Sequence, residues 1–409
     1  MIRGMLLNRT PYRGGCAARL RSLGMLFMLA ASTAAGGSGS RTGADPRLQY
    51  DDLAALKSRE PRAELPCQVT SDKPSLGFDL RYHSDYHAAV PVSVVADAGG
   101  WLQVAMRVVP TPETEHSTYV AHRFATPVVP LGSKGEVLVS SGLELGPGRY
   151  RVDWIMRDAR ERVCSTHWNL DARPGGGKQD LPLTLGPNQI VGLERYVSAN
   201  GPLIKREFAQ PLQVKILLNL SPAKPQESVV RPDDAAVLLS ILRSITGQSR
   251  IVLSTVVAFN LRAQKIVYRQ EHADQIDFAA LEKAAQSRTS GTIDVSDLRD
   301  PQRETHFVTR FLTDELGAQP DPPDAIVIIG SKVSLDRKVP LDSLKAKGSV
   351  MCPVLYLNYN SNPHEPWSDT IGSALKAYKV ATSYNIVFPR DVGLAIRELL
   401  SRIAKGPNS

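Results

Sequence analysis

The stretch LQVKILLNLSP, residues Leu212–Pro222, is a near-continuous apolar run that ends in a polar turn and a proline. Such a run predicts a strand buried on both faces, as in a parallel sheet covered by helices. A helix is predicted next, beginning at Pro232 with two acidic residues and ending at Gly247. Two further buried strands are predicted at Ala325–Ile329 and Val354–Asn358.

Polar side chains follow the first two of these strands. In open α/β sheets, ligands bind at the carboxyl ends of parallel strands. Here those positions hold Asn219–Ser221 and Gly330–Lys332. From residue 211 to 404 the predicted order is strand, helix, a two-strand hairpin, two helices, two strands, helix, strand and helix.

This order resembles the von Willebrand factor type A domain, and the resemblance covers residues 210–405. That family binds a divalent cation through Asp-x-Ser-x-Ser after the first strand and Thr-Asp-Gly after a later one. The corresponding residues here are Asn219, Ser221, Ala223, Ser331 and Lys332, so both carboxylates are missing. The resemblance implies an α/β doubly wound, Rossmann-like domain with a degenerate metal site, because magnesium needs carboxylates to offset its charge. We therefore expect no metal and no cofactor.

Residues 63–172 show a different pattern. Short alternating segments are separated by glycine or proline, with no helical period, which predicts an all-β sandwich. The stretch Gly146–Leu170 resembles the last strands of immunoglobulin-like modules, although this analogy says nothing of activity. The predicted fold class is thus multidomain: an immunoglobulin-like sandwich after a tether over 36–62, then a linker over 173–209, then the α/β domain.

The charge of the chain is concentrated at its amino terminus. The 409 residues carry a net charge of +8, and residues 1–35 hold five arginines and no acid, so the rest carries only +3. A charge this small is not the footprint of a nucleic-acid-binding protein.

The same segment predicts export. Its arginines precede the apolar run Leu23–Ala31, and small residues follow. This is the pattern of a signal peptide over residues 1–35, cleaved near Ala34–Gly36. The alternative is a retained membrane anchor, but the run is too short for a typical span. We expect an exported bacterial protein, periplasmic or secreted, with no membrane insertion after cleavage.

Cleavage leaves Cys67, Cys164 and Cys352. In an oxidising compartment, an odd number predicts one disulfide and one free thiol. Because Cys67 and Cys164 bracket the predicted sandwich, we expect them to pair and Cys352 to be buried and inert. Three free thiols are the alternative.

Other candidate sites have simpler explanations. His83 and His87 would form a metal-binding pair on a helix, but their surroundings predict strand and loop, so polar surface histidines are favoured. Ser221 follows a strand like a nucleophile, yet its hydroxyl is better explained as part of a turn. Trp367, in a long polar loop after the strand at Val354–Asn358, is a candidate partner contact.

The sequence therefore predicts a non-enzymatic exported protein that binds a protein or cell-envelope component through a metal-independent type A-like domain. The alternatives are a metal-dependent adhesin, an exported enzyme with a different site, and a structural assembly subunit.

Overall fold

The computed structural model describes residues 48–405, with gaps. Within that span the residues not described are 49, 113–116, 127–132, 174–180, 193–210, 225–226, 228, 272–275, 287–301, 318–320, 336, 346–349, 351 and 365–367. The chain divides into two units, Met1–Ala44 and Asp45–Ser409. The expected signal peptide and its cleavage point lie outside the described residues. No helix in the described part of the chain is both long enough and apolar enough to cross a bilayer.

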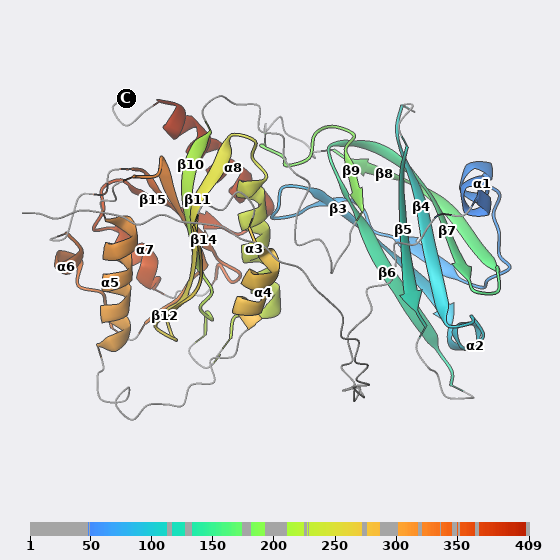
Figure 1. Ribbon diagram of the computed structural model, residues 1–409, viewed down its shortest axis with the longest axis horizontal. Coiled ribbons are helices and arrows are strands. Elements are labelled where there is room, and N and C mark those ends of the chain that lie inside the picture. Colours follow the sequence, from blue (N-terminus) through green and yellow to red (C-terminus); the bar gives the residue numbers. More distant parts are fainter. Residues whose placement is uncertain are drawn as a thin grey trace, which may run out of the picture. The chain divides into compact units, whose positions relative to one another are not determined.

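Two antiparallel sheets form the amino-terminal half of the described chain (Figure 1). The five-stranded sheet contains β1 (Gln68–Ser71), β2 (Ser75–Leu76), β3 (Tyr82–Pro91), β6 (Glu136–Leu145) and β9 (Ile190–Gly192). The four-stranded sheet contains β4 (Trp101–Pro110), β5 (Thr118–Ala125), β7 (Gly148–Asp158) and β8 (Val163–Ala172). The short helices are α1 (Tyr50–Ser58) and α2 (Val92–Ala96).

One hydrophobic core joins the two sheets. Strand β3 alternates buried and half-buried residues along its length, as expected of a strand with one face inward. Tyr86 of β3 and Trp154 of β7 meet in this core, with ring centroids 5.7 Å apart and planes at 66°. Edge-to-face aromatic pairs of this kind add stabilisation beyond the burial of their area.

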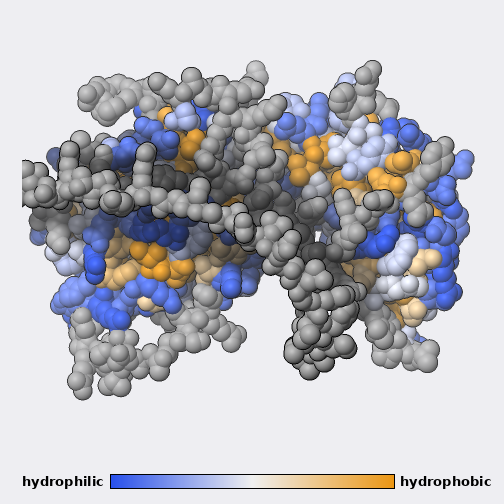
Figure 2. Space-filling model, viewed as in Figure 1, coloured by the Kyte–Doolittle hydropathy of each residue, from blue (hydrophilic) through white to orange (hydrophobic). Residues whose placement is uncertain are grey.

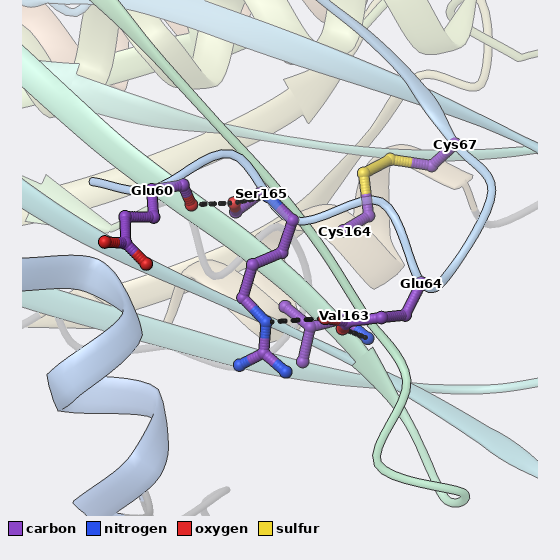
Figure 3. Close-up of a disulfide and its surroundings, with 7 residues drawn as sticks. Glu60, Glu64, Cys67, Val163, Cys164 and Ser165 are labelled. Carbon is purple, nitrogen blue, oxygen red and sulfur yellow. Dashed lines mark hydrogen bonds and ion pairs between the residues drawn. A yellow bond between two sulfur atoms is a disulfide. The ribbon is translucent and has the colours of Figure 1, made fainter. Parts of the chain in front are cut away.

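The expected disulfide between Cys67 and Cys164 is confirmed (Figure 3). It fastens the chain before β1 to the start of β8. Backbone hydrogen bonds reinforce the same junction, since Leu65 N donates to the carbonyl of Val163 at 3.1 Å. Cys352 is free and buried, as expected.

A six-stranded sheet forms the carboxyl-terminal half, in the order β12-β11-β10-β13-β14-β15. Its strands are β10 (Leu212–Asn219), β11 (Ile251–Asn260), β12 (Lys265–Glu271), β13 (Ala325–Ser331), β14 (Val354–Tyr359) and β15 (Ala381–Ile386). Neighbouring strands are parallel except β11 and β12, which form an antiparallel hairpin. The buried strands predicted at Leu212–Pro222, Ala325–Ile329 and Val354–Asn358 are therefore present.

Helices pack against both faces of this sheet (Figure 1). Leu217 of β10 belongs to one core and its neighbours Ile216 and Leu218 to the other, because successive side chains point to opposite faces. One face is covered by α3 (Pro232–Thr246), α4 (Phe278–Gln286) and α8 (Pro389–Lys405). The other is covered by α5 (Arg303–Leu316), α6 (Leu341–Lys345) and α7 (Thr370–Leu375).

The predicted fold class requires a correction. Of the described structure, 40% is strand and 27% is helix, arranged in three sheets, so the chain is mainly β. The predicted class, an immunoglobulin-like sandwich followed by an α/β doubly wound, Rossmann-like domain, is therefore wrong. Antiparallel pairing forms two of the three sheets and enters the third at β12, so strand outweighs helix in the described chain.

Candidate functional site

The carboxyl ends of three adjacent parallel strands bring several polar side chains together. Asn219 of β10 lies opposite Gly330 of β13, which in turn lies opposite Asn358 of β14. We call the region formed by Asn219, Ser221, Ser331, Asn358 and Asp369 the carboxyl edge. It combines residues at the ends of the three strands with Asp369, the N-cap residue of α7.

Asn219 organises the start of this edge. Its side chain is fully buried, and its Oδ1 accepts hydrogen bonds from the backbone N of Ser221 at 3.1 Å and from the Ser221 hydroxyl. The Ser221 Oγ in turn accepts from Leu261 N at 2.6 Å. A Cβ at Gly330 would lie 2.6 Å from the Asn219 Cβ, so the adjacent strand can approach only without a side chain there. The oxygens of Asn219 and Ser221 therefore hold the turn together.

Asp369 is the carboxylate of this edge, and it is held in unusual surroundings. Its Oδ2 accepts from Gly372 N at 3.2 Å, capping α7, and from the Asn358 amide at 3.3 Å. Burial raises the pKa of this carboxyl to about 6, against the opposing effect of hydrogen bonds from Tyr356 and from backbone amides. Burial also raises the pKa of the Tyr356 phenol, and the Asp369 charge beside it acts in the same direction. Asp369 is therefore poised to gain or lose a proton near pH 6.

Four buried side-chain atoms of this edge have no hydrogen-bond partner among the described atoms. They are Asn219 Nδ2, Ser331 Oγ, Asn358 Oδ1 and Asp369 Oδ1. A buried polar atom without a partner costs free energy, so such atoms are commonly satisfied by water or by a bound group.

The predicted site residues are only partly brought together. Asn219, Ser221 and Ser331 are buried at the carboxyl edge, while Ala223 and Lys332 are half-buried on the segments that follow β10 and β13. Trp367 lies outside the described residues.

Sequence reasoning missed the role of Asp369. The available signal was the pattern of a capping residue, because an aspartate directly precedes a helix with apolar residues. It gave no indication that the carboxyl is buried. A second cluster of polar side chains was also missed. Asp79, His83 and Glu144 are potential metal ligands that lie close together at the five-stranded sheet, and only the pairing of β3 with β6 brings Glu144 to His83.

Comparison with known proteins finds no family model and no curated protein that matches this chain. A glycosyl hydrolase family 2 member from Bacteroides cellulosilyticus DSM 14838 is similar at 10% identity and a TM-score of 0.19, over 83% of this chain and 40% of that one. The PilB minor pilin from Streptococcus sanguinis gives 6% identity and a TM-score of 0.26, over 73% and 87% of the two chains. This chain thus spans less than half the length of the hydrolase, and neither likeness is strong enough to indicate fold or function.

Proposed function

We propose that this is an exported, non-enzymatic protein that binds a protein or cell-envelope partner through the loops of the carboxyl edge, without a metal ion at that edge. The observation that carries the proposal is the hydrogen bonding of Asn219 and Ser221. Their oxygens stand where the type A resemblance expects metal ligands, but they accept hydrogen bonds from within the chain. Magnesium usually takes one or two carboxylates among its oxygen ligands, and neither Asn219 nor Ser221 supplies one.

The surroundings of the edge suit a protein surface as partner. Lys224, Arg337 and Lys338 are exposed on the segments that follow β10 and β13. Such charges at the rim of an interface set orientation and association rate more than affinity. On the face shown in Figure 2, hydrophobic residues gather in separate patches among hydrophilic ones. A mixed surface of this kind is ordinary for a folded protein, so the support for a protein partner comes from the rim charges.

The exported location is supported by the disulfide. Cys67–Cys164 is a cross-link of the kind that persists in oxidising compartments and is rare in the cytosol. Together with the predicted signal peptide, it favours a periplasmic or secreted protein.

Binding to a native envelope extract tests this function. We would measure the affinity of the immobilised chain for the component it retains, with and without EDTA. We would then compare Lys338→Glu, at the edge, with Lys283→Glu, an exposed lysine on α4 that makes the same charge change. The proposal expects the association rate to fall at least tenfold for the edge variant alone.

EDTA should leave the affinity unchanged. A tenfold loss with EDTA that persists in a His83→Ala background would show that the carboxyl edge does hold an ion. Equal losses in the two charge variants would show that the partner does not bind at this edge.

A further inference from the structure

Three side chains with metal-binding chemistry converge on the five-stranded sheet, far from the carboxyl edge in sequence. Asp79 lies in the turn between β2 and β3, His83 lies on β3, and Glu144 lies on β6 directly opposite His83. One ligand atom from each lies within 4.8 Å of the others. Strand pairing thus joins a local Asp–His pair to a glutamate that is distant in the sequence.

The distances between the His83 and Asp79 ligand atoms are close to the distance between two ligands of the same metal ion. His83 Nε2 lies 2.9 Å from Asp79 Oδ1 and 3.0 Å from Asp79 Oδ2. Two ligands bound tetrahedrally to zinc at their usual bond lengths lie about 3.3 Å apart. The pair therefore has to open by only a few tenths of an ångström to admit an ion.

Glycine at position 77 makes room for this arrangement. A Cβ there would lie 2.6 Å from the His83 ring and 2.7 Å from Asp79 Oδ1. Any larger residue at this position would collide with both side chains and displace them. The close approach of the backbone is thus a requirement of the cluster.

Neighbouring groups hold the two carboxylates in place. The Arg81 guanidinium pairs with Glu144 Oε2, and Arg81 N donates to Asp79 Oδ1 at 3.2 Å. Arg81 Nε donates to the Thr184 hydroxyl at 3.1 Å, and that hydroxyl donates to the Asp79 carbonyl at 2.9 Å. Carboxylates that bind metals are commonly oriented by such outer hydrogen bonds. The Arg81 ion pair takes Oε2 of Glu144, and the second oxygen of that carboxylate remains.

We propose that Asp79, His83 and Glu144 bind a divalent transition-metal ion, with Zn²⁺ preferred and water completing its coordination. The donor set decides the choice of metal. One imidazole nitrogen with two carboxylates suits zinc, whereas magnesium and calcium prefer oxygen ligands throughout. Arg81 opposes an additional cation, so the affinity is lower than that of a closed four-ligand zinc site.

Calorimetric titration of the chelator-stripped full chain with ZnCl₂ tests the proposal, with Co²⁺ absorption as a second readout. We expect one saturable site per chain, weakened at least tenfold in His83→Ala and in Glu144→Gln. The matched control is His87→Ala, because His87 lies on the same strand but its Nδ1 bonds the Ser140 hydroxyl at 2.8 Å. That variant should bind within about twofold of the native chain.

Circular dichroism of each metal-free variant shows whether a loss of zinc binding comes from loss of the site or from loss of the fold. If one of the two ligand variants misfolds, the other still tests the site. Absence of saturable binding up to millimolar zinc would overturn the proposal. So would native affinity in His83→Ala, or an equal loss in His87→Ala.

Discussion

Replacing Asp369 by asparagine should make the stability of this protein less sensitive to pH. The Asp369 carboxyl has a pKa of about 6 in the folded chain, compared with 3.8 for an ordinary aspartate. The folded state therefore binds this proton more tightly than the unfolded state. The stability that this proton contributes is complete below about pH 4 and is lost as the pH rises through about 6.

The size of the effect follows from the same two pKa values. Each pKa unit corresponds to about 1.4 kcal/mol, so the carboxylate reduces the free energy of unfolding by about 3 kcal/mol at pH 7.5 relative to its protonated form. An asparagine retains an oxygen to cap α7 at Gly372 N and does not ionise. We expect the variant to match the native chain near pH 4 and to exceed it by up to about 3 kcal/mol at pH 7.5.

Urea unfolding, followed by circular dichroism between pH 4.5 and 7.5 with the disulfide intact, measures this difference. Asp277→Asn is the matched control, since Asp277 caps α4 through Ala280 N at 2.9 Å but is exposed to solvent. A difference between Asp369→Asn and the native chain that stays constant within about 0.5 kcal/mol over this range would refute the reasoning.

Three further predictions concern the rest of the chain. Replacing Cys67 and Cys164 by serine opens a cross-link between residues 97 apart and should lower the free energy of unfolding by about 5 kcal/mol in the chain-entropy model, measured in urea. Glu315→Gln weakens the buried ion pair with Lys215, whose Nζ lies 2.8 Å from Glu315 Oε2, and should lower the free energy of unfolding by about 3 kcal/mol. A decrease below about 1 kcal/mol would show that water reaches the lysine. Amino-terminal sequencing of exported protein should find cleavage near residues 34–36, and a chain that begins at Met1 would contradict the signal-peptide prediction.

Local patterns in the sequence determined many elements of this protein. The apolar run in Leu212–Pro222 specified a strand buried on both faces, and the structure places β10 there. Pro232 and Gly247 marked the limits of α3, because proline suits a first helical turn and glycine commonly follows a last one. The pairing of Cys67 with Cys164 followed from their positions around one β region. Each of these signals depends on burial and on backbone preference within a short segment.

The tertiary structure decided which distant side chains meet. Lys215 interrupts an apolar strand, and only the packing of α5 against that strand supplies Glu315, 100 residues away, as its partner. The fold class depends on the whole set of strand pairings, which is why the predicted class was wrong although the strand predicted at Leu212–Pro222 is present. In the same way, the pairing of β3 with β6 sets Glu144 opposite His83. Strand order and helix packing decide these contacts, and the local pattern of one partner does not specify which distant segment it meets.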